Sequence, residues 1–193
     1  MEKIDNKNKV TLIVIWILIM LITVIGATFA YFKAVAESKP QIITTEGLTF
    51  SLVIDGPINV DDIKPTAWND NDLSANENNE DVTIIPFNVF SNTGIDGSYK
   101  VNMTTNITEN NLYEGGSAED IKYKVYRNNQ LVKSGNFTTG DFNAEIVNGT
   151  ITENGVNDDY KLYIYIENKD NVQNKLQGIS FTVTLIGTAD QNS

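Results

Sequence analysis

The hydrophobic pattern divides the chain near residue 33. No residue from Val10 to Phe32 is charged, and its polar side chains are those of Thr11, Thr23 and Thr28. As a helix this run extends about 35 Å at about 1.5 Å per residue, and the hydrocarbon core of a bilayer is about 30 Å thick. Backbone groups in lipid must be hydrogen-bonded within the segment. The run therefore predicts one N-terminal membrane helix, residues 10–32.

Beyond this run, hydrophobic and polar residues alternate in short segments that are separated by turn residues, as in half-buried β-strands. The predicted strands with this alternation are Leu48–Ile54, Tyr99–Thr105, Ile121–Tyr126, Tyr160–Ile166 and Ile179–Ile186, and Val82–Phe90 is predicted from a mostly apolar run. Pro86 predicts a sheet edge or a bulge, because proline cannot donate to a ladder. Asn128-Asn129 and Asn148-Gly149 predict hairpin turns, because these residues tolerate positive φ. The pattern predicts an all-β fold, an antiparallel β-sandwich of the jelly-roll or Ig-like kind, in residues 47–193.

Flanking charge orients the predicted membrane helix. Lys3, Lys7 and Lys9 precede the run, whereas Lys33 and Lys39 follow it with Glu37 between them, so the positive excess on the N-terminal side is slight. The positive-inside rule then makes residues 1–9 a cytoplasmic tail and places the β-domain outside the membrane.

Composition narrows the classes of function. The formal net charge is -11, and the only acidic residues before residue 37 are Glu2 and Asp5. The outer domain should therefore repel nucleic acid, which we do not expect as a partner. The chain has no Cys and no His, which removes disulfides, the commonest zinc ligand and every Ser-His or Cys-His pair. No other catalytic motif is recognisable, so we expect a protein that is not an enzyme.

The polar stretch Trp68–Asp81 predicts a long surface loop between two strands. Asp70, Asp72 and Asp81 have the spacing of oxygen ligands in a calcium-binding loop, although Ala75 stands where such a loop needs glycine. Calcium is thus the one cofactor that the residues suggest. The alternative is a solvated acidic loop without a metal.

Tyr163 and Tyr165 share one face of their predicted strand, opposite Leu162 and Ile164. If that face points to solvent, the two rings form a ligand-binding surface. The alternative is a role in the core or in cross-strand pairs.

The end of the apolar run has the pattern of a signal-peptide cleavage site. Thr28 and Ala30 are small residues at positions −3 and −1, which predicts cleavage before Tyr31. However, the run is longer than the roughly 7–15 residues of a signal-peptide core, which favours a retained anchor. Residues 10–32 are thus a signal peptide or a signal-anchor helix, and the protein is extracellular or anchored at the cell surface.

Several segments resemble the TasA and camelysin-like biofilm matrix proteins of Gram-positive bacteria, which are exported through a SipW-type signal peptidase. Gly26–Phe32 is similar to the end of their signal peptide, and Glu46–Leu52 to the first strand of the mature protein. Ile63-Lys64-Pro65 resembles their Leu-Lys-Pro-Gly turn without its glycine, and Asn174–Phe181 resembles the approach to their last strand.

The resemblance implies a jelly-roll β-sandwich, cleavage after Ala30 by a signal peptidase, and self-assembly into extracellular fibres by strand donation. Residues 33–46 would supply the donor strand, with Val35, Ile42 and Ile43 as its β-branched residues. Without His or Cys, the metalloprotease activity described for camelysin-like members is not expected here. The alternative function is a membrane-anchored binding module or adhesin that uses Tyr163 and Tyr165 or the acidic loop.

Overall fold

The computed structural model describes residues 41–45, 48–54, 58–92, 94–108, 112, 117–169, 176 and 179–191, together with Trp16 and Met20. The chain forms two compact units, Met1–Ser38 and Lys39–Ser193. Within the described part of the chain, no helix is both long and apolar enough to cross a bilayer. The predicted tail, residues 1–9, and all of the predicted membrane run except Trp16 and Met20 lie outside the described residues.

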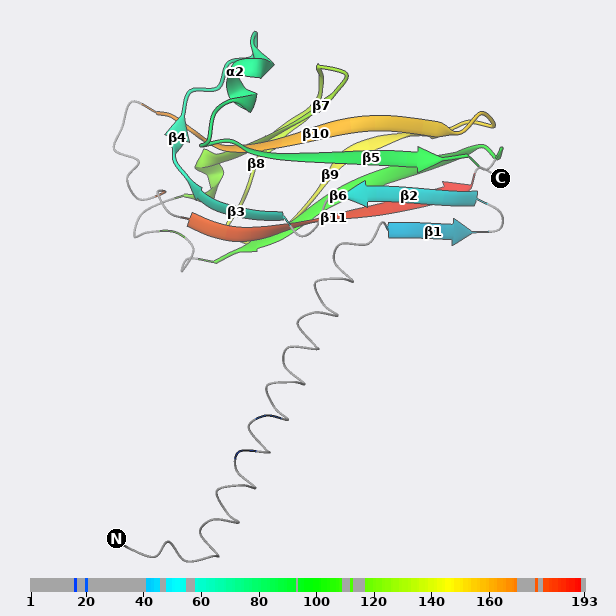
Figure 1. Cartoon of the computed structure of the whole chain (residues 1–193), viewed down its shortest axis with the longest axis horizontal. Coiled ribbons are helices and arrows are strands. Elements are labelled where there is room, and N and C mark those ends of the chain that lie inside the picture. The colour runs from blue at the N-terminus through cyan, green and yellow to red at the C-terminus, as the bar shows by residue number, and fades with distance from the viewer. Residues whose placement is uncertain are drawn as a thin grey trace, which may run out of the picture. The chain divides into compact units, whose positions relative to one another are not determined.

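The second unit is built from two β-sheets (Figure 1). One sheet contains β1 (Gln41–Thr45), β2 (Leu48–Ile54), β4 (Pro65–Thr66), β5 (Thr83–Ser91), β7 (Ile121–Arg127), β8 (Gln130–Asn136) and β10 (Val156–Glu167). The other contains β3 (Ile58–Ile63), β6 (Gly97–Ile107), β9 (Gly140–Ile151) and β11 (Ile179–Gln191). A short helix, α2 (Leu73–Glu77), follows β4, and a 3-10 turn, η2 (Ala118–Asp120), precedes β7.

Most strands that pair with each other are not consecutive in the sequence. The seven-stranded sheet runs β1-β2-β5-β10-β7-β8, with β4 beside β10, and the four-stranded sheet runs β3-β11-β6-β9. The described ladders are antiparallel except the short β4–β10 pair. The prediction of an all-β, antiparallel fold is therefore confirmed.

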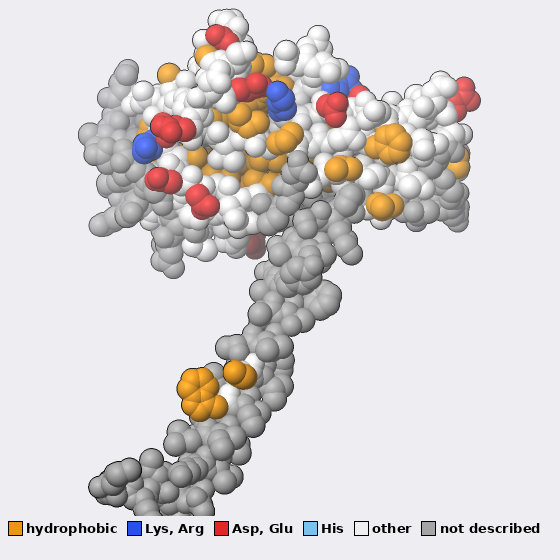
Figure 2. All heavy atoms as spheres, viewed as in Figure 1, with side chains coloured by type: hydrophobic (Ala, Val, Ile, Leu, Met, Phe, Trp, Pro, Cys, Tyr) orange, Lys and Arg blue, Asp and Glu red, His pale blue; other side chains and the backbone are white. Residues whose placement is uncertain are grey.

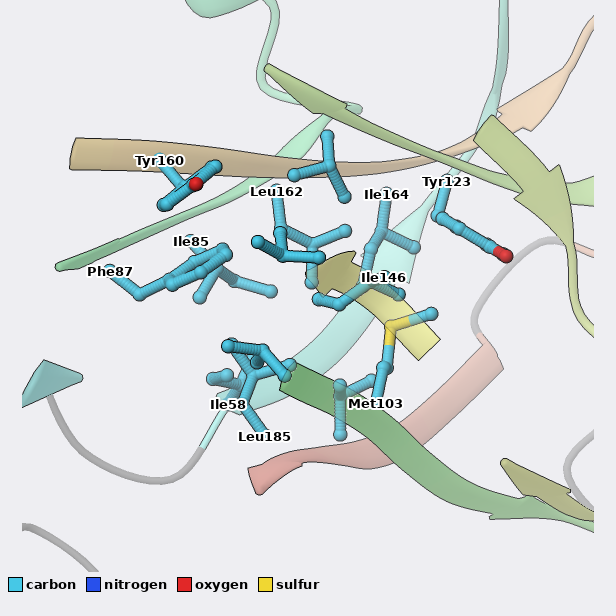
Figure 3. Packing of buried hydrophobic residues seen from close by; sticks show 14 of the residues in the cluster. Ile58, Ile85, Phe87, Met103, Tyr123, Ile146, Tyr160, Leu162, Ile164 and Leu185 are labelled. Atoms are coloured by element: carbon cyan, nitrogen blue, oxygen red, sulfur yellow. The ribbon is translucent and has the colours of Figure 1, made fainter. Parts of the chain in front are cut away.

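The core lies between the two sheets, because each strand turns alternate side chains inward. In Figure 3 the labelled side chains of the seven-stranded sheet are Ile85, Phe87, Tyr123, Tyr160, Leu162 and Ile164, and those of the other sheet are Ile58, Met103, Ile146 and Leu185. These residues are buried and belong to one continuous cluster. On the outside, Figure 2 shows acidic side chains spread over the visible face, several with basic side chains beside them.

Asn128-Asn129 forms the predicted hairpin turn. Both residues have positive φ, 50° and 62°, and Arg127 pairs with Gln130 where β7 and β8 meet. Asparagine tolerates this backbone region better than other residues with a side chain.

The predicted turn at Asn148-Gly149 is wrong, because both residues lie inside β9, opposite Lys100 and Tyr99 of β6. A Cβ on Gly149 would come within 2.6 Å of the Tyr99 ring. The glycine therefore makes room for a buried aromatic ring and does not reverse the chain.

β5 is an inner strand, because it pairs with β2 on one side and with β10 on the other, but at Pro86 itself the described pairing is with β10 alone. The proline is accommodated because the described β2–β5 ladder ends at Ile54 and Phe87, one residue before it. Pro86 thus lies just beyond the β2 ladder, where its missing N–H matters less.

Candidate functional site

One candidate site is the sheet edge formed by β1. This five-residue strand pairs antiparallel with β2, from Gln41 opposite Leu52 to Thr45 opposite Leu48. In the described strand order it is the last strand on its side of the sheet. A terminal strand that is held by one ladder is the part of a sheet most easily exchanged or extended.

The structure places two of the three predicted donor-strand residues in β1. Ile42 lies opposite Ser51 and is 65% exposed, and Ile43 lies opposite Phe50. Val35 lies outside the described residues, as do Thr28, Ala30 and Tyr31 of the predicted cleavage site. The described part of the predicted donor segment thus pairs with β2 of its own chain.

A second candidate site is the outer face of the seven-stranded sheet, where residues 68–81, here called the covering loop, fold back over the sheet. Trp68 stacks on Tyr165 with ring centroids 4.7 Å apart and meets Tyr163 edge-on at 5.4 Å. Tyr126 lies 6.3 Å from the same indole ring. These rings, with Val82 and Leu73 among others, form a small hydrophobic cluster outside the main core.

Ion pairs fasten the covering loop to the strands beneath it. Asp70 accepts a hydrogen bond from the indole N–H of Trp68 at 2.9 Å and pairs with the Lys124 ammonium group, which lies 5.0 Å from the Trp68 ring centre. Glu77 of α2 accepts hydrogen bonds from Lys161 Nζ and the Tyr163 hydroxyl, both at 2.7 Å.

These bonds shift the pKa values of the two carboxyl groups. The pKa of Asp70 is lowered, chiefly by the hydrogen bond from Lys124. The pKa of Glu77 is lowered mainly by the hydrogen bond from Lys161 and then by that from Tyr163. Burial, followed by the neighbouring Glu77, raises the pKa of Tyr163. Both carboxylates are therefore charged at neutral pH, as the ion pairs require.

The three predicted calcium ligands each take a different role. Asp70 pairs with Lys124, and Asp72 caps α2 by accepting the Ala75 N–H at 3.1 Å. Asp81 Oδ1 lies 3.9 Å from Lys64 Nζ. Within the described ranges, no cluster of three acidic side chains is close enough to hold a metal ion. The structure thus does not bring Asp70, Asp72 and Asp81 together.

Tyr163 and Tyr165 do lie on the outer face, as the alternation indicates, but the covering loop buries both. The surface loop predicted for residues 68–81 instead contains α2 and an inward-packed tryptophan. Sequence reasoning did not assign a role to Trp68 or Glu77. A single tryptophan at the start of a long polar stretch is the signal that suggests a loop packed onto the domain, because so large an apolar side chain is seldom left in water.

Beside the covering loop, the outer face of the sheet forms an open groove of about 500 Å³. A first row of lining residues runs across three neighbouring strands. Val53 of β2 pairs with Asn88 of β5, which in turn pairs with Asp159 of β10. The Asn88 amide donates hydrogen bonds to Asp159 Oδ1 and to Asn157 Oδ1, both at 2.8 Å. The Asn128-Asn129 turn also lines the groove.

The second row of the groove borders the covering loop. Pro86 pairs with Lys161, and Lys161 pairs with Tyr126 on the other side. Lys161 lines the groove, and its ammonium group pairs with Glu77 of α2 in the covering loop.

A buried polar cluster joins the two sheets near one end of the sandwich. The hydroxyl oxygens of Tyr99 and Tyr160 lie 2.8 Å apart, and Tyr99 donates to Asp158 Oδ2 at 3.1 Å. Asp158 also pairs with Arg127 at 3.0 Å. Burial is the main cause that raises the pKa of both tyrosines, so both hydroxyls stay protonated and hold the Tyr99 ring in place.

Comparison with known proteins gives no match, either to a protein-family model or to a curated protein.

Proposed function

We propose that this chain is an exported structural subunit of extracellular fibres, in which β1 passes from one subunit to the sheet of the next. The role is structural and not catalytic, and the place is the cell surface or the surrounding matrix. The proposal draws on the N-terminal apolar run, the cleavage pattern at Ala30 and the resemblance to TasA and camelysin-like proteins.

The observation that carries the proposal is the position of β1. It follows the N-terminal unit directly, forms the end of the seven-stranded sheet and pairs within the described chain only with β2. Removing it would leave the free edge of β2, a row of unpaired N–H and C=O groups that an identical strand from another subunit matches.

Exchange of an identical strand costs little free energy, because the same residues make the same ladder in either arrangement. Two residues, Glu46 and Gly47, separate β1 from β2, so in the exchanged form the hairpin must open and β1 must continue away from β2. The main remaining cost is association entropy, which a high local concentration of anchored or newly exported subunits offsets.

We also propose that the sandwich is of the jelly-roll kind. In support, the chain crosses between the two sheets at most connections, for example from β2 to β3, from β5 to β6 and from β9 to β10. Repeated crossing between two antiparallel sheets is typical of that topology.

Cysteine pairing tests the exchange directly, because the chain has no cysteine of its own. Ile42 and Ser51 lie opposite each other across β1 and β2, so Ile42→Cys and Ser51→Cys are made in separate chains and mixed under oxidising conditions. If β1 moves between subunits, a disulfide-linked heterodimer forms. The matched control mixes Ile42→Cys with Thr184→Cys, an exposed position on β11, and should give no heterodimer.

A second preparation carries Ile42→Cys and Ser51→Cys in the same chain. An intramolecular disulfide in the double variant, with no cross-link in the mixture and no fibres by electron microscopy, would show that β1 stays in its own sheet and would refute the proposal. Deletion of residues 31–44 should leave a folded monomer that does not polymerise.

A further inference from the structure

We propose that the open groove on the outer face of the seven-stranded sheet binds a neutral saccharide chain. This inference does not depend on fibre formation, since the described residues that line the groove belong to other parts of the sheet than β1.

The charges of the groove favour an uncharged ligand. Lys161 is paired with Glu77 at 2.7 Å, and Asp159 accepts a hydrogen bond from the Asn88 amide. The Lys161 charge is therefore balanced, whereas Asp159 keeps its negative charge, because the Asn88 amide is neutral; the groove thus disfavours anionic ligands. The whole chain carries a net charge of -11, which also repels anions such as phosphates and acidic glycans.

The hydrogen-bonding groups of the groove suit hydroxyl groups, which donate and accept at once. The Asn88 amide nitrogen is occupied, but its oxygen remains an acceptor, and Asp159 keeps a second carboxylate oxygen. The side chains of Asn128 and Asn129 are exposed and make no hydrogen bond to another described residue. Each offers two N–H donors and one carbonyl acceptor.

The remaining surface of the groove is apolar. Val53 is 39% exposed, and Pro86 is exposed in the neighbouring strand. Such a wall matches the C–H face of a sugar ring, whose hydroxyls then point toward the amides. The volume of about 500 Å³ lies within the range of about 300–1,000 Å³ for ligand sites, and the open shape allows a chain to continue beyond it.

The position of the groove argues against a peptide strand. Peptides that bind to sheets mostly pair with the backbone of an open edge. Here the strands under the groove are β2, β5, β10 and β7, whose backbone groups pair with one another. Recognition on these strands therefore falls mainly to side chains, namely amides, one carboxylate, the ion-paired Lys161, the largely buried Tyr126 and small apolar groups.

The test measures binding of neutral hexasaccharides, namely cellohexaose, chitohexaose and mannohexaose, by isothermal titration calorimetry. The full chain is kept in a detergent whose headgroup is not a sugar. The main variant is Asn128→Gly/Asn129→Gly, because glycine accepts the positive φ of both positions and removes only the amides. The control is Asn102→Ala on β6 of the other sheet, and thermal unfolding checks that each variant is folded.

We expect at least one hexasaccharide to bind the wild type, with the dissociation constant about tenfold larger in the double glycine variant and unchanged in Asn102→Ala. A second variant, Asn88→Ala, should weaken binding in the same direction. The proposal is overturned if none of the three saccharides binds at millimolar concentration, if the double glycine variant binds as tightly as the wild type, or if the anionic polymer polygalacturonate binds more tightly than all of them.

Discussion

Replacing Trp68 by alanine should remove the main contact that holds the covering loop on the sheet. The indole ring has two close aromatic partners, Tyr165 at 4.7 Å and Tyr163 at 5.4 Å. Such pairs contribute about 0.5–1.5 kcal/mol each beyond the area that they bury. Because Trp68 is half-buried, the lost burial adds about 1–2 kcal/mol. We expect a loss of about 3 kcal/mol in the free energy of unfolding.

Urea unfolding, followed by circular dichroism, measures this loss. For a domain of this size, 1 kcal/mol corresponds to about 2–4 °C in Tm, so the Tm of Trp68→Ala should fall by about 6–12 °C. The variant should also bind a hydrophobic dye, because Tyr163 and Tyr165 become exposed. Trp68→Phe keeps a ring in the stack, so its free energy of unfolding should fall by less than half as much as that of Trp68→Ala.

A double-mutant cycle with Tyr165→Leu separates the ring contact from other effects of the substitution. If Trp68 and Tyr165 interact as the structure has them, the two losses should not add, and the coupling energy should be about 1 kcal/mol. If the free energy of unfolding of Trp68→Ala is within about 0.5 kcal/mol of the wild-type value, the covering loop is not part of the folded core. The reasoning about the outer face would then be wrong.

Two further predictions concern the core and the acid response. Gly149→Ala should destabilise the domain by about 1–3 kcal/mol in urea unfolding, because the added Cβ would lie 2.6 Å from Tyr99; an unchanged midpoint would contradict this packing. Because the pKa of Glu77 is lowered below its ordinary value of 4.5, chiefly by Lys161, its contribution is complete above about pH 4.5 and is lost as the pH falls through the lower folded-state pKa. Stability measured from pH 6 to pH 2 should therefore decline less steeply in Glu77→Gln than in the wild type, and equal slopes would refute the assignment. Processing gives the last prediction: Ala30→Arg should block cleavage and leave a precursor of higher mass on immunoblots, whereas normal processing of this variant would place the cleavage site elsewhere.

The fold class and most strand positions were predictable from local pattern. In β5, β7 and β11, buried side chains mostly alternate with more exposed ones, as burial of one set against a core requires. From Leu162 to Ile166, β10 is buried on both faces. The Asn128-Asn129 turn was predictable for a similar reason, because positive φ is a property of the residues at the turn itself. The proposed roles in export, fibre formation and ligand binding go beyond these elements and rest on the experiments above.

Other features depend on contacts between residues that are far apart in the sequence. Asn148-Gly149 has the local chemistry of a turn, yet it lies within β9. There Gly149 leaves space for the ring of Tyr99 from β6. Tyr163 and Tyr165 were correctly placed on one face, but the covering loop decides that this face is closed.

The groove likewise exists only in the folded sheet. Val53, Asn88 and Asp159 form its first row because β2, β5 and β10 lie side by side. The period of a strand determines which side chains share a face. It does not determine the neighbouring strand, because every backbone offers the same N–H and C=O groups. That choice is made by packing the whole sandwich around one core, and the candidate sites follow from it.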